Sequence, residues 1–91
     1  MHGANGYLID QFLKSNSNQR KDKYGGSAEN RCRYVLELVD IALAYFEPYQ
    51  IGLKVSPCSR YNDMYDENPI ETYSHLFKKL DQKNLGFIEV R

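Results

Sequence analysis

The order of strands and helices along these 91 residues constrains the fold more than any other feature. The pattern predicts the end of a strand at the N-terminus, then a loop, a helix, a strand, a second loop, a second helix and a last strand. Alternating strands and helices form parallel sheets with right-handed crossovers. Because parallel strands need neighbours and cover on both faces, so few strands leave exposed edges. The pattern therefore predicts a segment of a larger α/β protein.

A first helix is expected over residues 28–46, after a polar loop at residues 14–26. Ser27 can accept a hydrogen bond from an unpaired N–H of the first turn, and Pro48 prevents the helix from continuing. Its apolar positions form one broad face: Val35, Leu38, Val39, Ala42 and Tyr45. The preceding loop contains four basic residues that we expect to be solvated: Lys14, Arg20, Lys21 and Lys23.

Residues 50–56 alternate between apolar and small or polar side chains, which predicts a strand. The loop at residues 57–68 is long for a compact α/β unit, and long ordered loops are disproportionately functional. A second helix begins after it, because Asn68 can cap the helix and Pro69 suits its first position. The expected buried stripe of this helix is Ile70, Tyr73, Phe77 and Leu80. A further strand is expected at residues 85–90.

Composition is that of an ordinary soluble globular protein, with 42% apolar and 26% charged residues. Acidic and basic residues cancel, so nothing favours a nucleic-acid surface or an anionic membrane. No apolar run approaches the roughly 20 residues that span a bilayer. Cys32 and Cys58 lack the spacing of a zinc site, and unclustered cysteines suggest a reducing compartment. We therefore expect a cytoplasmic protein with neither a nucleic-acid nor a membrane partner, and no metal.

The N-terminal stretch concentrates side chains that can carry chemistry. His2 and Asn5 lie three positions apart and can donate hydrogen bonds to one oxygen, which would stabilise an enolate-like transition state. Tyr7 carries a proton at neutral pH and could act as a general acid. A structural interpretation is the alternative: Asn5 and Gly6 form a turn, His2 is a polar cap and Tyr7 packs. Spacing alone favours the structural interpretation.

Lys54 is the second candidate site residue, since it shares a strand face with Gly52 and Ser56. In a closed barrel that face would look inward, where a lysine is costly unless an anion or acceptor meets it. Gly52 would leave room for the approach of a ligand. On an open sheet edge, by contrast, Lys54 would simply be hydrated.

Other polar and aromatic residues are expected to support structure or to surround a site. Arg31 and Arg33 can anchor the preceding loop by donating hydrogen bonds to its carbonyl groups. Tyr61, Met64 and Tyr65 belong to the long loop and could line the mouth of a substrate site. We expect the arginines to be structural and not catalytic.

The motifs of this chain resemble the old yellow enzyme family of FMN-dependent ene-reductases, which includes the oxophytodienoate reductases. The resemblance rests on H-x-A-N-G-Y-L-x-x-Q-F-L, S-N-x-R and D-x-Y-G-G-S-x-E-N-R, and then on IGLKVSP, where the family has V-G-x-R-x-S-P. It covers nearly the whole chain, but only about a quarter of a family member, whose fold is a complete (β/α)8 TIM barrel.

The resemblance implies that residues 1–91 are part of one NADH:flavin oxidoreductase domain, from the end of barrel strand four through helix four, strand five and helix five to strand six. It implies that His2 and Asn5 bind the oxygen of an activated alkene, usually an α,β-unsaturated carbonyl compound, and that Tyr7 protonates an alkene carbon. Hydride would come from FMN reduced by NADPH or NADH, with His2 and Lys54 as flavin contacts. Lys54 aligns with an arginine, so it keeps the charge and loses the planar fork of donors.

The family comparison leaves open how the 91 residues act. The first three and the last two barrel strands lie outside them, and with those strands most of the expected flavin contacts. We therefore expect the isolated chain to be inactive, and the missing strands to come from the rest of a longer chain or from another chain. The alternative is a non-catalytic remnant, or a small α/β module that associates through its open strand edges.

Overall fold

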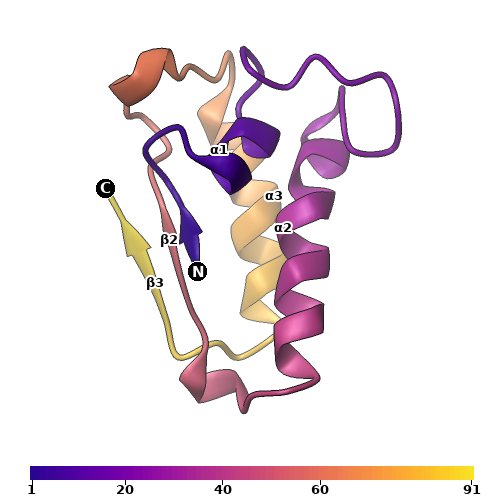
Figure 1. Ribbon diagram of the computed structural model, residues 1–91, viewed down its shortest axis with the longest axis vertical. Coiled ribbons are helices and arrows are strands. Elements are labelled where there is room, and N and C mark those ends of the chain that lie inside the picture. Colours follow the sequence, from indigo (N-terminus) through magenta and orange to yellow (C-terminus); the bar gives the residue numbers. More distant parts are fainter.

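The computed structural model describes all 91 residues and has one parallel sheet on one side and helices on the other (Figure 1). Its strands are β1 (His2–Gly3), β2 (Gly52–Val55) and β3 (Phe87–Val90), in the order β1-β2-β3. Both pairings are parallel, so the carboxyl ends of the three strands point to the same end of the sheet. The predicted α/β class and parallel sheet are confirmed.

The helices all lie against one face of the sheet, and the opposite face is uncovered (Figure 1). They are α1 (Leu8–Leu13), α2 (Ala28–Leu43) and α3 (Pro69–Asp81), with short 3-10 helices η1 (Pro48–Gln50) and η2 (Tyr61–Asp63). The side chain of Ser27 accepts a hydrogen bond from the Asn30 N–H, and that of Asn68 accepts one from the Glu71 N–H, so both predicted caps are confirmed. Helix α2 ends at Leu43, three residues before the expected end at 46.

Helix α1 was not expected from the sequence. It has only six residues, fewer than two turns, and its first residue follows Tyr7, whose side chain makes no capping hydrogen bond. It brings Ile9 and Leu13 into the core, and it directs Asp10 into the same buried region. A short helix without a cap carries too few periodic positions to be recognised.

The core fills the space between the sheet and the helices. Its ten residues are Ile9, Leu13, Cys32, Val35, Val39, Leu53, Val55, Tyr73, Leu76 and Leu80. The predicted buried stripe of α3 was wrong at Ile70, which is 79% exposed. The prediction also omitted Leu76, which is fully buried. At 100° per residue, Ile70 points about 100° away from the centre of the buried stripe. Tyr45 is also exposed, because it lies beyond the end of α2.

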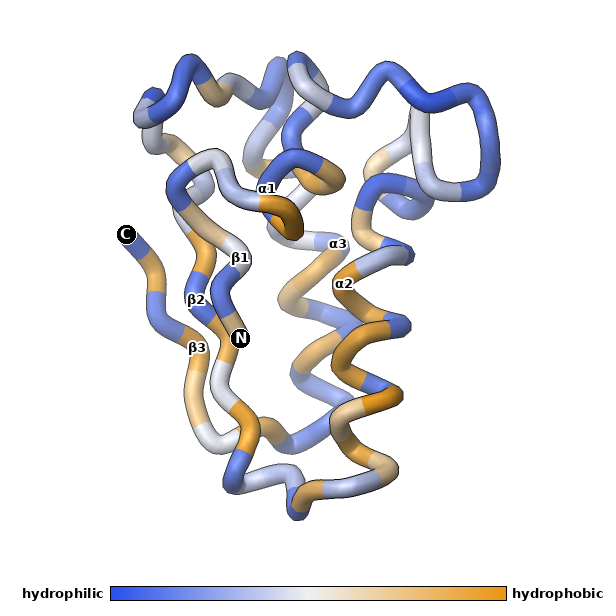
Figure 2. The backbone as a smooth tube through the Cα atoms, in the orientation of Figure 1, coloured by the Kyte–Doolittle hydropathy of each residue, from blue (hydrophilic) through white to orange (hydrophobic).

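The polar loops gather at the carboxyl end of the sheet, where residues 14–26 and 57–68 are mostly hydrophilic (Figure 2). Arg31 donates hydrogen bonds to the carbonyl oxygens of Gly26 and Leu13, and Arg33 donates one to that of Lys23. The expected anchoring of this loop by the two arginines is therefore confirmed. None of the helices has the length and apolar character of a membrane-spanning segment. No three His, Cys, Asp or Glu side chains are grouped in a way that could hold a metal ion.

Lys14 corrects the expectation of a solvated basic loop. Its side chain is fully buried, whereas the other three basic residues of the group are exposed. The Lys14 Nζ donates hydrogen bonds of 2.6 Å to the carbonyl oxygens of Ser56 and Pro57. These carbonyls directly follow β2, so the lysine binds the end of α1 to the end of the central strand.

The two thiols are free and differ in exposure, which gives a first testable prediction. Burial raises the pKa of the Cys32 thiol to about 12, and the thiolate is the reactive form. We expect an aromatic disulfide reagent to modify Cys58 rapidly in the native chain, and to modify Cys32 only after unfolding. The Cys58→Ser variant should lose the fast phase alone. Fast modification of both thiols in the native chain would contradict the burial of Cys32.

Candidate active site

The first candidate residues surround a tight turn at the carboxyl end of β1. Asn5 and Gly6 both have left-handed backbone conformations, with φ of 60° and 79°. The predicted Asn-Gly turn is therefore present. Asparagine and glycine are the residues that adopt this conformation most readily. The turn reverses the chain between His2 in β1 and the start of α1, at the strand ends where enzymes of this architecture hold their sites.

The side chains on either side of the turn face each other. The ring centroids of His2 and Tyr7 lie 5.4 Å apart at an interplanar angle of 43°. Tyr7 is 52% exposed and His2 is exposed, so neither ring is part of the core. An imidazole and a phenol are thus available to one small molecule, with the half-buried Asn5 in the turn between them.

Lys54 lies beside His2 on the uncovered face of the sheet. The register of β1 and β2 pairs the Cα atoms of these two residues, and paired residues in neighbouring strands point to the same face. Leu53 and Val55 alternate with Lys54 and point to the helices instead. The Lys54 Nζ lies 3.5 Å from Oε1 of Glu89 on β3, and its side chain is 26% exposed. The structure thus brings His2 and Lys54 together on one surface.

The space beside Gly52 is not open to a ligand, contrary to expectation. The Phe87 ring of β3 lies directly over it, so that a Cβ on Gly52 would clash with the Phe87 ring. Gly52 therefore admits an aromatic ring of the neighbouring strand. Ser56, expected on the face of Lys54, is fully buried just beyond the strand, and its Oγ accepts a 2.9 Å hydrogen bond from the Asn5 N–H.

A buried polar cluster of Asp10, Lys14 and Tyr73 lies next to the turn and bonds to its backbone through Asp10. It was not predicted from the sequence. The Asp10 carboxylate accepts a 2.9 Å hydrogen bond from the Gly6 N–H and a 3.4 Å bond from the Tyr73 hydroxyl. Burial raises the pKa of Asp10, and the Gly6 hydrogen bond and the Lys14 charge oppose this shift. Burial lowers the pKa of Lys14, opposed by Asp10. An aspartate among the apolar residues of α1, four positions before a lysine, was the available signal.

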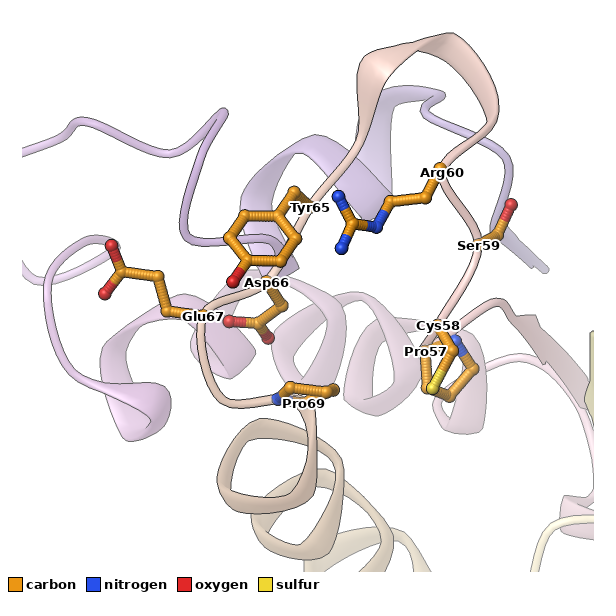
Figure 3. Close-up of a pocket in the computed structure, with 8 residues that line it drawn as sticks. All are labelled: Pro57, Cys58, Ser59, Arg60, Tyr65, Asp66, Glu67 and Pro69. Atoms are coloured by element: carbon orange, nitrogen blue, oxygen red, sulfur yellow. The ribbon is translucent and has the colours of Figure 1, made fainter.

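The long loop after β2 encloses a separate cavity of about 230 Å³ (Figure 3). Its lining residues are Pro57, Cys58, Ser59, Arg60, Tyr65, Asp66, Glu67 and Pro69. The Arg60 guanidinium lies over the Tyr65 ring, 4.3 Å from its centroid. This cavity includes none of the residues around the turn. Of the residues expected at a substrate mouth, Tyr61 is exposed and Met64 is buried against Gly6.

Comparison with known proteins places the chain in one family. Residues 1–89 match the NADH:flavin oxidoreductase / NADH oxidase family. A probable flavin mononucleotide-dependent alkene reductase from Leishmania infantum is 46% identical over 90 residues, which are 99% of this chain and 25% of that protein. A putative 12-oxophytodienoate reductase 2 from Oryza sativa subsp. japonica is 42% identical, over 97% of this chain and 23% of that protein.

Solved structures agree with the sequence matches. Morphinone reductase superposes with a TM-score of 0.94 at 36% identity, covering 98% of this chain and 24% of that one. The old yellow enzyme homologue from Zymomonas mobilis gives 0.95 at 31% identity, covering 99% of this chain and 25% of that one. These neighbours are TIM-barrel proteins, and the chain spans about a quarter of their length. The chain belongs to the NADH:flavin oxidoreductase / NADH oxidase family.

Proposed function

We propose that residues 1–91 form the part of an FMN-dependent oxidoreductase that binds the substrate oxygen and supplies the proton when an activated C=C bond is reduced. The substrates would be α,β-unsaturated carbonyl compounds, and the reductant NADPH or NADH. The observation that carries the proposal is the gathering of His2, Asn5 and Tyr7 around one turn at the carboxyl end of β1. The names of an alkene reductase and a morphinone reductase among the relatives support the reaction class.

In this proposal the sheet is one arc of a barrel. Strands β1, β2 and β3 would be barrel strands four, five and six, with α2 and α3 as helices four and five. The uncovered sheet face that carries Lys54 would then line the barrel interior. Residues 1–91 would make up about a quarter of the domain, in agreement with the share of the relatives that they match.

The chemistry follows from the hydrogen-bonding capacity of the three side chains. His2 and Asn5 would donate to the carbonyl oxygen of the substrate, where negative charge develops as hydride reaches the β-carbon. Tyr7 would then transfer its phenolic proton to the α-carbon, which completes the saturated product. Bound FMN, once reduced by NADPH or NADH, supplies the hydride.

The residues on the uncovered face fit part of a flavin site. Lys54 and His2 offer an ammonium and an imidazole side by side, and both can donate to the acceptor-rich edge of a flavin ring. Glu89 partly neutralises the ammonium at 3.5 Å, and lysine lacks the two-pronged donor geometry of arginine. These residues supply two contacts, so the other flavin contacts, including those to the phosphate, must come from outside residues 1–91.

The proposal is tested with a barrel chimera: the Leishmania infantum alkene reductase with its matching segment replaced by residues 1–91. We expect the chimera to bind FMN and to reduce 2-cyclohexenone with NADPH or NADH. The isolated 91-residue chain should neither bind FMN tightly nor oxidise NADPH in the presence of the enone. A folded, FMN-loaded chimera without enone reduction would contradict the assigned chemistry, and turnover by the isolated chain would contradict the need for a complete barrel.

One observation favours the non-catalytic alternative, in which the chain associates through open strand edges. All four residues of β3 are exposed, including Phe87 at 61% and Val90 at 56%. Such an edge is a template for pairing with another strand. Sedimentation of the isolated chain distinguishes the two cases. Discrete oligomers that dissociate when Val90 is replaced by lysine would support the association module, and a monomer would oppose it.

A further inference from the structure

We propose that Asn62 is a positioning residue for Asn5, through which the loop at residues 57–68 fixes the oxygen-binding carboxamide. The inference rests on the proposed function, because it takes Asn5 as a ligand of the substrate oxygen. The evidence is the set of hydrogen bonds that fixes the turn at Asn5 and Gly6. The backbone groups of these two residues bond to side chains from three separate parts of the chain, and not to the backbone of a helix or strand.

All four backbone polar groups of Asn5 and Gly6 are bound by side chains. The Asn5 N–H donates to Ser56 Oγ at 2.9 Å, the Gly6 N–H donates to Asp10 Oδ2 at 2.9 Å, and the two carbonyl oxygens accept 2.8 Å bonds from Asn62 Nδ2 and Gln11 Nε2 respectively. A complete set of this kind fixes both peptide planes of a turn. The backbone of Asn5 therefore has one defined orientation, from which its carboxamide projects.

Asn62 is the partner that belongs to the long loop at residues 57–68, where it lies in η2 with a non-helical backbone. Its φ is 58° and that of the following Asp63 is 60°, so two consecutive residues adopt the left-handed conformation. Asparagine and aspartate adopt this conformation more readily than other non-glycine residues, but normally as single residues and not in succession. From this backbone the Asn62 Nδ2 donates its hydrogen bond to the Asn5 carbonyl oxygen.

The loop is also packed and tied against the turn, so that Asn62 has a fixed place. A Cβ on Gly6 would lie 2.7 Å from the Asn62 Cβ, which shows how closely the two segments approach. Asn16, just after α1, exchanges hydrogen bonds with the backbone of Tyr65 and donates one to the Asp63 carbonyl. The loop is thus joined to the residues that follow the turn as well as to the turn itself.

The first test uses the 91-residue chain and needs no activity. The Asn62→Asp variant keeps the shape and the tolerance for a left-handed backbone but loses the donor, and Asn62→Gly loses the side chain without adding charge. Asp63→Asn is the matched control, since that left-handed residue is exposed and its carbonyl, not its side chain, bonds to Asn16. We expect the NMR couplings that report the Asn5 φ angle to change from the value for a φ of 60° toward averaged values in both Asn62 variants and to stay unchanged in the control. Unchanged couplings in both Asn62 variants would overturn the proposal.

The second test measures enone reduction by the barrel chimera. We expect Asn62→Asp to lower kcat/KM about tenfold, since small misplacements of a binding group have large kinetic effects, and Asp63→Asn to change it less than about twofold. In an Asn5→Gly background, which keeps the turn and removes the carboxamide, Asn62→Asp should have no further effect. An equal loss in both backgrounds would show a structural role only and overturn the inference. An inactive chimera would overturn the proposed function, and the NMR result would still decide the role of Asn62.

Discussion

Replacing Tyr7 with phenylalanine is expected to lower kcat for enone reduction by the barrel chimera by about 10²–10⁴-fold, the usual contribution of a positioned general acid. The variant keeps the ring beside His2 and removes only the phenolic proton. Because His2 and Asn5 still bind the carbonyl oxygen, KM should change less than about twofold. A loss of kcat without a matching change in KM is the signature of a group that acts in the chemical step.

Stability and a second tyrosine provide the controls for this experiment. Tyr7 is 52% exposed, so the loss of its hydroxyl should change the free energy of unfolding by less than about 0.5 kcal/mol. Tyr45 is 80% exposed and lies beyond the end of α2, remote from β1, and Tyr45→Phe should leave kcat unchanged. A Tyr7→Phe chimera with kcat within about threefold of the parent would refute the assignment of Tyr7 as proton donor.

The sequence predicted those parts of the fold that depend on local signals. The caps at Ser27 and Asn68 and the strand predicted over residues 50–56 each depend on a few neighbouring residues. Both caps were confirmed, and the strand was confirmed over the shorter range Gly52–Val55. Helix ends and the buried stripe of α3 were less accurate. Ile70 is apolar and follows Pro69, but its exposure depends on how α3 is rotated against the sheet, which only the packed structure determines.

The buried polar residues could not be predicted, because their partners are distant in sequence. Lys14 begins a polar loop and looks solvated, yet its hydrogen-bond acceptors are Ser56 and Pro57, more than 40 residues later. Asn62 likewise bonds to Asn5 across 57 positions. Residues that support a site from elsewhere in the chain carry no local pattern.

The candidate site itself shows why two interpretations of the same residues can both hold. Spacing favoured a structural turn at Asn5 and Gly6, and the structure contains that turn. The turn does not compete with a binding role, since it leaves the rings of His2 and Tyr7 exposed and close together. The roles of the three side chains came from the family resemblance, and geometry alone would have supported only a polar cluster at a strand end.

Replacing Lys14 with methionine is expected to lower the free energy of unfolding of the 91-residue chain by about 3 kcal/mol at pH 8. Methionine fills similar space, but it leaves two carbonyl oxygens without their donor and removes the positive charge that acts on Asp10. Urea unfolding followed by far-UV circular dichroism measures the change. Lys21→Met, an exposed lysine of the same loop, should shift the free energy by less than about 0.5 kcal/mol.

The pH dependence of the stability lost in Lys14→Met tests whether Asp10 is the group that responds to the missing positive charge. In the parent chain, burial already raises the Asp10 pKa above its ordinary value of 3.8, and the charge of Lys14 opposes this shift. Without Lys14 the folded-state pKa of Asp10 rises further. The folded chain then retains a proton that the unfolded chain has released, so the free energy of unfolding falls as the pH rises through the window above 3.8. We therefore expect Lys14→Met to be more destabilising at pH 8 than at pH 5, and adding Asp10→Asn should remove this difference. A loss that is equal at both pH values would show that the unpaired carbonyl groups, and not Asp10, account for the effect.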